Sequence, residues 1–318
     1  LHPRGPELLL RACRCRRRGA ADMLAQQILN GLVVGGVYAL FALGFTLVFG
    51  IHHLMNLAHG AVFMTGAFVA LYSVLAGFPL WVGFLLAIVA CGFLSVLIEI
   101  TAFRRLRKSG EAEFGAIIST LGADLIIITF AQKISASEVL RFPFETFPVR
   151  IFEIAGLRVS LLQMFMAVCA FVLMLVLTYY LYRTPLGTRV RSVSGNERAA
   201  VLSGVNPNVV YFQTFFLSGA LAGASGVLIG LAFNSIQFTM GEPFLLRGFV
   251  VIVLGGMGSI PGAMVAGLLF GMIQTLTAAY LPAGLTDAII FSLLFLILLV
   301  RPYGLFGKET AGAMRAER

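Results

Sequence analysis

The sequence predicts an all-α, polytopic membrane protein with about eight to nine transmembrane helices. Of its 318 residues, 59% are hydrophobic and 12% are charged, against roughly 25% charged residues in soluble globular chains. The apolar residues gather in long segments, and about 20 such residues form a helix that crosses the hydrocarbon core of a bilayer. A water-soluble domain of this size could not bury so much apolar surface, so we expect the bilayer to be the solvent.

Nine apolar segments are the predicted spans. They are Leu24–Phe49, Asn56–Leu75, Leu80–Phe103, Gly115–Gln132, Leu161–Tyr182, Val209–Phe233, the short Pro243–Leu254, Ala263–Leu281 and Thr286–Val300. Glycine pairs at GxxxG spacing recur in three of them, at Gly31/Gly35, Gly219/Gly223, Gly226/Gly230 and Gly267/Gly271. This spacing is typical of helices whose backbones pack closely in lipid.

Basic residues orient these spans. Four of them follow the third span (Arg104, Arg105, Arg107, Lys108) and four follow the fifth (Arg183, Arg189, Arg191, Arg198). Cytoplasmic loops carry such excesses, so both connectors are predicted to be cytoplasmic. The same parity places residues 133–160 and the start of the first span outside, and the C-terminal tail inside. Membrane orientation thus accounts for the net charge of +9 without nucleic acid.

The expected organisation is one transmembrane domain, residues 23–307, with 183–208 as a cytoplasmic loop and 308–318 as a cytoplasmic tail. Residues 1–22 are interpreted as a mis-assigned or disordered extension, with Met23 as the true start. Their arginines would lie outside, against the positive-inside tendency. They also lack the order of regions of a signal peptide. The four cysteines, Cys13, Cys15, Cys91 and Cys169, have no disulfide or metal-ligand spacing.

A short helix is predicted inside the loop 183–208. Ser194 to Glu197 reads S-x-x-E, which is typical of a capping box. The helix is expected to run through Leu202 and to end at Gly204. So short a helix is marginal by itself in water, and it either docks on a partner protein or packs on its own bundle.

Polar residues also interrupt the apolar pattern at Gly50–Gly60. Polar side chains at membrane depth are costly unless they are paired or face water, so Asn56 and His59 are candidates for a solute path. His52 and His59 would share a face of a continuous helix. A metal site there lacks an HExxH pattern or a carboxylate partner, and hydrogen bonding is the favoured interpretation.

A glycine-rich stretch, Gly255–Gly262, must interrupt the helix between two apolar runs. Irregular backbone near membrane depth lines a cavity or is buried in protein, and broken helices in transporters point their ends at solutes. A tight turn at the membrane surface explains the pattern equally well.

Two ionisable residues lie within or beside spans. Asp124 is placed to contact the ammonium group of a solute, a neighbouring helix or a water-filled cavity. Arg247, beside Glu242, is interpreted as one member of an outer ion pair rather than as a ligand clamp.

Four motifs in order resemble one family. Asn30–Leu40, Met55–Gly60, Pro185–Arg189 and Leu254–Gly262 look like segments of the branched-chain amino-acid ABC transporter permeases, and more narrowly of the first of the two permease types in that system. The resemblance runs from about Ala25 to Gly307. His52, His53 and Asp124 depart from the more apolar residues expected there. Urea and short-amide permeases share this scaffold, so they are the alternative substrate class.

The resemblance implies a type II ABC importer-like bundle in a bacterial inner membrane that moves branched-chain or related hydrophobic amino acids inward. The implied partners are a second, homologous permease, two ATP-binding cassette subunits and a periplasmic solute-binding protein. The chain has no GxxxxGK[ST] of its own, so no catalytic residue, metal or cofactor is expected in it and ATP would be bound by the partners. The residues implied at the ATPase contact are Gly187, Asn196, Glu197, Ala200 and Gly204.

The candidates for the translocation path are Asn56, His59, Asp124, Gly255, Gly256 and Ser259. Two hypotheses of other classes stay open. An intramembrane metalloenzyme would use His52, His53 and His59 on a metal. A passive channel would conduct solute without an ATPase.

Overall fold

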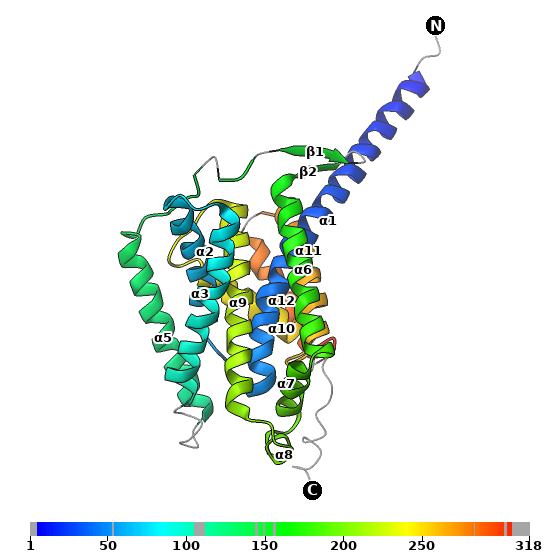
Figure 1. The fold of residues 1–318 in the computed structure, drawn as a ribbon. Helices are drawn as coiled ribbons and strands as arrows, with labels where there is room; N and C mark the ends of the chain where they lie inside the picture. The colour runs from blue at the N-terminus through cyan, green and yellow to red at the C-terminus, as the bar shows by residue number, and fades with distance from the viewer. Residues whose placement is uncertain are drawn as a thin grey trace.

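The apolar segments fold into helices that run roughly side by side (Figure 1). The computed structural model describes residues 5–52, 54–104, 112–143, 146–148, 150–154, 157–282, 284–301 and 304–306, without the side chains of 5–22, 112, 113, 154, 294 and 298. The elements are α1 (Gly5–His52), α2 (His59–Leu75), α3 (Leu80–Ile98), the π-helix η1 (Glu99–Phe103), α5 (Ala112–Ile134), β1 (Ile151–Ile154), β2 (Leu157–Ser160), α6 (Leu161–Arg183), α7 (Pro185–Gly195), α8 (Glu197–Leu202), α9 (Pro207–Phe233), α10 (Gly241–Gly255), α11 (Ile260–Tyr280) and α12 (Leu285–Val300).

Each predicted apolar segment coincides with a helix, which confirms the all-α class. Six described helices are long and apolar enough to cross a membrane: parts of α1, α3 with η1, α5, α6, α9 and α11. The other three, α2, α10 and α12, are shorter. Several predicted boundaries differ from the observed ones: α1 ends at His52 and not at Phe49, α2 begins at His59 and not at Asn56, and α11 begins at Ile260 and not at Ala263. The predicted extension 1–22 and tail 308–318 have no described side chains.

The centre of the bundle is formed by α1 and α9, whose apolar side chains are mostly buried. On α1, the backbone at Gly35 lies against Gly267 and Leu268 of α11. On α9, Gly226 lies against the carbonyl oxygen of Phe63 in α2. The glycines at GxxxG spacing therefore allow close backbone contact between helices, as the sequence predicts. Such contact matters in lipid, because the hydrophobic effect does not drive helices together there.

Several connections meet at one end of the bundle, the lower end in Figure 1. There the Ser194 hydroxyl of α7 donates a hydrogen bond to the carbonyl of Gly50 near the end of α1. Gly50 also lies against Gly258 in the α10–α11 loop. Residues 304–306 return to the end of α10, where the Leu305 N–H donates to the Leu254 carbonyl over 2.8 Å. We call this end, which carries residues 183–208, the inner end.

A small hairpin marks the opposite, outer end. β1 pairs antiparallel with β2, with Ile151 opposite Ser160 and Ile154 opposite Leu157. It is fastened to α1, because the Gln26 amide donates to the Arg158 carbonyl over 2.8 Å and accepts from the Arg158 N–H over 2.9 Å. The sequence analysis missed these strands, which are only four residues long each.

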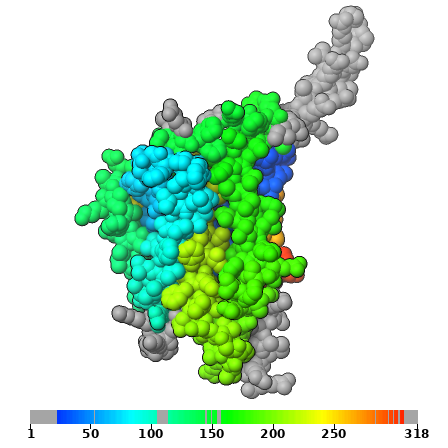
Figure 2. Space-filling view, in the orientation of Figure 1, coloured from blue at the N-terminus to red at the C-terminus, as the bar shows by residue number. Residues whose placement is uncertain are grey.

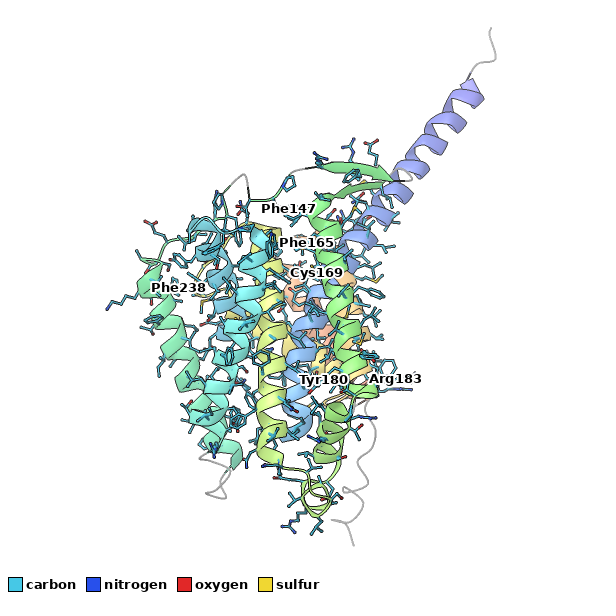
Figure 3. The ribbon with its side chains drawn as sticks, viewed as in Figure 1. Phe147, Phe165, Cys169, Tyr180, Arg183 and Phe238 are labelled. Atoms are coloured by element: carbon cyan, nitrogen blue, oxygen red, sulfur yellow. The ribbon has the colours of Figure 1, made fainter. Side chains whose placement is uncertain are left out.

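The outer surface of the helices is apolar. Figure 2 shows α3 and α6 on the near face with α9 between them. Along α6, Phe165, Cys169 and Tyr180 follow one another down to Arg183 at the inner end (Figure 3). Many large apolar side chains on α3, α5 and α6 are exposed, which suits a surface solvated by lipid. The chain is a multi-pass membrane protein.

Candidate functional site

The helix breaks inside the bundle between α1 and α2. After α1 ends at His52, residues 54–58 have no helical structure, and α2 starts at His59. There the His59 ring lies 3.2 Å from the Phe41 carbonyl, about three helical turns back along α1. The residues before His59 therefore run through the interior of the bundle, and Leu54, Asn56 and Ala58 are buried. Such irregular backbone is tolerated at membrane depth because protein surrounds it.

Buried polar side chains without partners collect near this break. Asn56 is 1% exposed, and among the described residues neither its amide nitrogen nor its amide oxygen has a hydrogen-bond partner. The Thr46 hydroxyl on α1 is likewise buried without a hydrogen-bond partner among the described residues. Leaving a buried amide unpaired costs about 1–3 kcal/mol. Native chains keep such groups where they bind water, an ion or a ligand.

His59 is fixed in place by its neighbours. Its imidazole contacts the Phe41 carbonyl and lies 3.5 Å from the Ser218 hydroxyl of α9. It also packs against the rings of Phe41 and Phe45. This histidine therefore ties α1, α2 and α9 together at the break.

His52 has a different environment. Its ring packs against Phe103, Tyr211 and Phe215, and His53 lies outside the described residues. Because the helix is interrupted, His52 and His59 do not share a helical face as the sequence suggested. In the part of the chain that the structure describes, no group of three or more His, Cys, Asp or Glu side chains is placed to hold a metal ion.

Two polar residues of α5 hold the break from the side. The Leu57 N–H donates to the Thr120 hydroxyl over 3.3 Å. One turn further along α5, the Asp124 carboxylate lies close enough to the backbone N–H of Ala61, in the first turn of α2, to interact with it electrostatically. No side chain at the N-cap of α2 does this, so Asp124 supplies the negative charge that a helix N-terminus favours. Of its predicted roles, contact with a neighbouring helix is the one observed.

The start of α10 meets the start of α2 at the same place. The backbone of Gly241 touches that of Gly60, and Glu242, in the first turn of α10, lies close enough to Asp124 for their charges to interact. Two helix starts therefore meet here, with the half-buried Asp124 and the exposed Glu242 beside them. The arrangement resembles the discontinuous helices around which transporters build solute sites.

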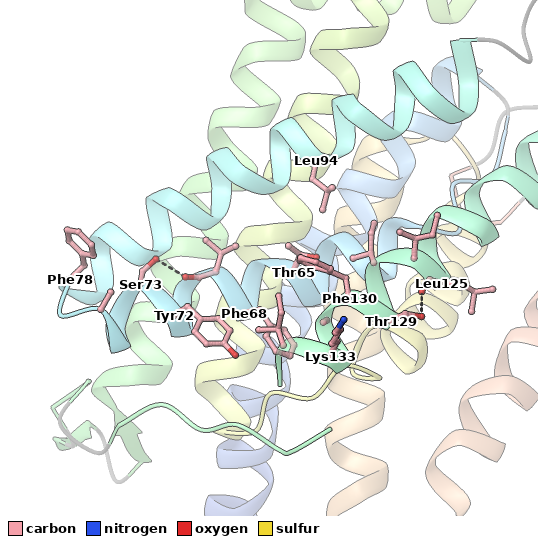
Figure 4. A pocket seen from close by; sticks show the side chains of 16 residues that line it. Thr65, Phe68, Tyr72, Ser73, Phe78, Leu94, Leu125, Thr129, Phe130 and Lys133 are labelled. Carbon is pink, nitrogen blue, oxygen red and sulfur yellow. Dashed lines mark hydrogen bonds between the residues drawn. The ribbon is translucent and has the colours of Figure 1, made fainter. Parts of the chain in front are cut away.

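Beside this region, α5 stands away from α2. A cleft of about 1040 Å³ separates them (Figure 4). Apolar side chains of both helices line it, among them Phe68, Tyr72 and Phe130, and Lys133 lies at its edge with the last turn of α5. Thr120 and Asp124 consequently supply polar contacts between α5 and the rest of the bundle.

Arg247 is a member of an ion pair, as the sequence predicts, but its partner is not the neighbouring Glu242. The guanidinium of Arg247 binds Asp287 of α12, with 3.1 Å between Arg247 Nη2 and Asp287 Oδ1. It also reaches the Tyr38 hydroxyl over 3.4 Å. Arg247 therefore pairs with an acid 40 residues away in the sequence, although Glu242 is much nearer to it along the chain.

At the inner end, residues 185–202 form two helices instead of one. Thr184 caps α7, and Asn196 caps α8 by accepting a hydrogen bond from the Ala199 N–H over 3.0 Å. The predicted capping box from Ser194 is therefore wrong, since Ser194 belongs to α7 and binds Gly50. Asn and Ser are both good N-caps, but α7 continues through Ser194 to Gly195, so Asn196 is the residue left to cap α8.

The residues proposed for the ATPase contact divide by exposure. Gly187 packs against the backbone of Leu181, and Ala200 is buried. Gly204 ends α8 with a φ of +82°, where a side chain would be strained. Only Glu197 of this set presents a charged side chain at the surface. The structure adds Leu202, which is 90% exposed at the tip of α8.

The glycine-rich stretch is a tight connection at the inner end. Gly255 ends α10 and lies against Gly262 of α11. Gly256 has a φ of +96°, and the Ser259 hydroxyl caps α11 by accepting from the Gly262 N–H over 3.2 Å. These three predicted path residues have local structural roles in the observed conformation.

Sequence reasoning missed Thr46, Thr120, Ser218 and Leu202. Thr120 and Asp124 had a detectable signal, because polar residues four apart on an otherwise apolar helix lie on one face. Leu202 had none, since a leucine in a short helix usually packs inward.

Comparison with known proteins decides the family. Residues 27–299 match the family described as the branched-chain amino acid transport system permease component. The chain belongs to this family.

Relatives of this permease cover nearly its whole length. The high-affinity branched-chain amino acid transport system permease protein LivH of Salmonella typhimurium and that of Escherichia coli are each 32% identical over 89% of this chain and 95% of their own length. BraD of Pseudomonas aeruginosa has the same identity and coverage. The ribose import permease RbsC of Bacillus subtilis is 34% identical over 34% of each chain. No solved structure matches.

Proposed function

We propose that this chain is the permease subunit of an ABC importer that carries branched-chain or related hydrophobic amino acids inward across a bacterial inner membrane. The observation that carries the proposal is the 32% identity to LivH and BraD over almost the whole chain. Those relatives are named as branched-chain amino acid permeases. The same resemblance argues for a second permease, two ATP-binding cassette subunits and a solute-binding protein as partners.

The inner end supports a contact with an ATPase. α8 projects beyond the ends of the long helices (Figure 1), anchored by buried Ala200 and capped by Asn196. Its outward residues, Glu197 and Leu202, combine an acid with a fully presented apolar side chain. Val201 beside Leu202 is exposed as well, and contiguous exposed apolar side chains indicate a protein contact. In this proposal α8 transmits ATPase closure to α7 and to the end of α1.

The break region supports a solute path. Alternating access requires parts of the bundle to move around polar groups at membrane depth. Asn56, His59 and Asp124 lie where α1, α2, α5, α9 and α10 meet, and α5 is attached through few polar contacts. We propose that movement of α5 relative to α2 opens and closes this region.

Reconstitution tests the function. The chain would be assembled in liposomes with the proposed partner subunits, and uptake of radiolabelled L-leucine, L-isoleucine and L-valine would be compared with uptake of urea and acetamide. The expected result is ATP-dependent inward movement of the amino acids. Uptake of urea or acetamide alone would transfer the chain to the alternative substrate class, and flux of any solute without ATP would favour a channel.

A further inference from the structure

An Arg–Asp ion pair lies on the side of the bundle formed by α10 and α12. Nη2 of Arg247 is 3.1 Å from one carboxylate oxygen of Asp287 and 3.4 Å from the other. Nη1 of Arg247 is 3.4 Å from the Tyr38 hydroxyl. Three helices distant in sequence thus contribute one polar cluster.

The pair lies within the membrane-spanning part. Asn30 of α1, whose side chain hydrogen-bonds Gln163 in the first turn of α6 over 3.0 Å, marks the outer level. Tyr38 is about 12 Å further along α1 at about 1.5 Å per residue. The hydrocarbon core is about 30 Å thick, so Tyr38 and the Arg247 guanidinium bound to it lie inside it, with Asp287 in the first turn of α12.

The pair is not sealed in the protein. The side chain of Arg247 is 22% exposed and that of Asp287 is 56% exposed. Ionised side chains at membrane depth face the bundle interior or a water-filled cavity, because lipid cannot solvate them. This face of α10 and α12 therefore borders water or a partner protein, and not acyl chains.

Neutral polar groups and aromatic rings surround the pair. The side chain of Gln274 reaches the Tyr38 hydroxyl, and its buried Oε1 has no hydrogen-bond partner among the described residues. Phe244 stacks on Tyr38 with 5.3 Å between ring centroids, and Phe270 meets it edge-on at 4.9 Å. Tyr38 and Phe270 are buried and Phe244 is half-buried, so the cluster presents one cation and one anion at the edge of a buried polar and aromatic layer.

We propose that Arg247 and Asp287 bind the two charged groups of the transported amino acid as it passes. The α-carboxylate takes the place of Asp287 on the guanidinium of Arg247, since guanidinium binds carboxylates through paired hydrogen bonds. The α-ammonium group binds the freed Asp287 carboxylate, and the apolar side chain lies against the half-buried ring of Phe244. This inference rests on the proposed function and names the site at which that function recognises a zwitterion.

The exchange explains why the pair is half open. Two ion pairs replace one, so neither a charge of the protein nor a charge of the solute is left unpaired at membrane depth. When the solute leaves, Arg247 and Asp287 rejoin. A site of this kind can release its ligand, because the protein regains its own ion pair as the contact is lost.

The first test measures L-leucine moved per ATP hydrolysed by the reconstituted complex. In the double variant Arg247→Met, Asp287→Leu, a merely structural pair would be dispensable, because replacing both partners by apolar residues is often neutral. The proposal expects this ratio to fall roughly tenfold or more, the usual effect of losing a hydrogen bond to a charged group. The matched control is Arg158→Gln, Glu153→Gln, which removes an exposed ion pair of the hairpin and should leave the ratio unchanged.

An unchanged ratio in the Arg247/Asp287 double variant overturns the inference and leaves the proposed function standing. If the unmodified complex moves none of the branched-chain amino acids, the proposed function itself has failed. The two failures are therefore distinguishable.

A second test keeps the ion pair intact. In a chain whose four cysteines are replaced by alanine, Phe291→Cys places a thiol one turn from Asp287 on α12. A membrane-impermeant thiosulfonate should label it, and L-leucine should slow the labelling, whereas leucinamide and 4-methylpentanoate should not. Val176→Cys on the exposed surface of α6 is the unlabelled control. Absence of labelling at 291, or equal labelling with all three compounds, contradicts the proposal.

Discussion

Asn56 is the residue whose burial most needs an explanation. Its amide is enclosed beside the helix break without a hydrogen-bond partner among the described residues, at a cost that a leucine of similar size would not carry. Thr120 contrasts with it, because its hydroxyl is buried and bonded to the Leu57 N–H and the Ala116 carbonyl. The Thr120 hydroxyl thus stabilises the break, whereas the Asn56 amide is retained in spite of its energetic cost.

The variant Asn56→Leu is predicted to be as stable as the original chain or more stable, by up to about 3 kcal/mol, and to transport poorly. Thr120→Val should instead lower stability by roughly 1 kcal/mol, because the Leu57 N–H loses its acceptor. Thermal unfolding in detergent and L-leucine uptake would be measured on both. An Asn56→Leu variant with full uptake would remove Asn56 from the solute path.

At the scale of elements, close backbone contact holds α9 against α2. A Cβ at Gly226 would overlap the Phe63 carbonyl oxygen, whereas a Cβ at Gly122 of α5 would meet no atom within 4 Å. Gly226→Ala is therefore predicted to destabilise the bundle by roughly 1–3 kcal/mol. Gly122→Ala should be neutral or stabilise α5 by up to about 1 kcal/mol. Equal unfolding temperatures for the two variants would contradict this packing.

α8 is the element for which exposure predicts a partner. Leu202→Ser should leave the unfolding temperature unchanged, because the side chain is 90% exposed, but should reduce co-purification of the ATPase subunits. Glu197→Leu should uncouple transport from ATP hydrolysis. Ser203→Ala, at the exposed end of the same helix, is the control. If uptake and stimulated ATPase activity both survive the first two changes, α8 is not the coupling element.

At the scale of the whole molecule, one end gathers the arginine-rich connector, the end of α1 and the α10–α11 loop, and the other end carries the hairpin. The positive-inside tendency predicts that the first end lies in the cytoplasm. Epitope tags at residue 195 and at residue 258 should be accessible only after cells are permeabilised. A tag between β1 and β2 should be accessible on spheroplasts whose inner membrane is intact. A tag at residue 195 that is reached from outside would refute both the orientation and the ATPase contact.

Local properties of the chain determined the all-α membrane class and the helix-packing glycines. Apolar length, GxxxG spacing and loop charge act within one segment, so they can be read without knowing its neighbours. The helix ends were harder to predict from the sequence. Asn196 and Ser194 are equally good caps by themselves, and only the length of α7 and the bond from Ser194 to Gly50 select Asn196.

The tertiary structure alone decided the contents of the candidate site. The burial of Asn56, the grip of Thr120 and Asp124 on the start of α2, and the pairing of Arg247 with Asp287 instead of Glu242 all join residues that are far apart in the sequence. Each depends on how whole helices are placed, and the energy of such a contact belongs to two segments at once. The sequence therefore named several of the participants, and the packing of the helices assigned their partners.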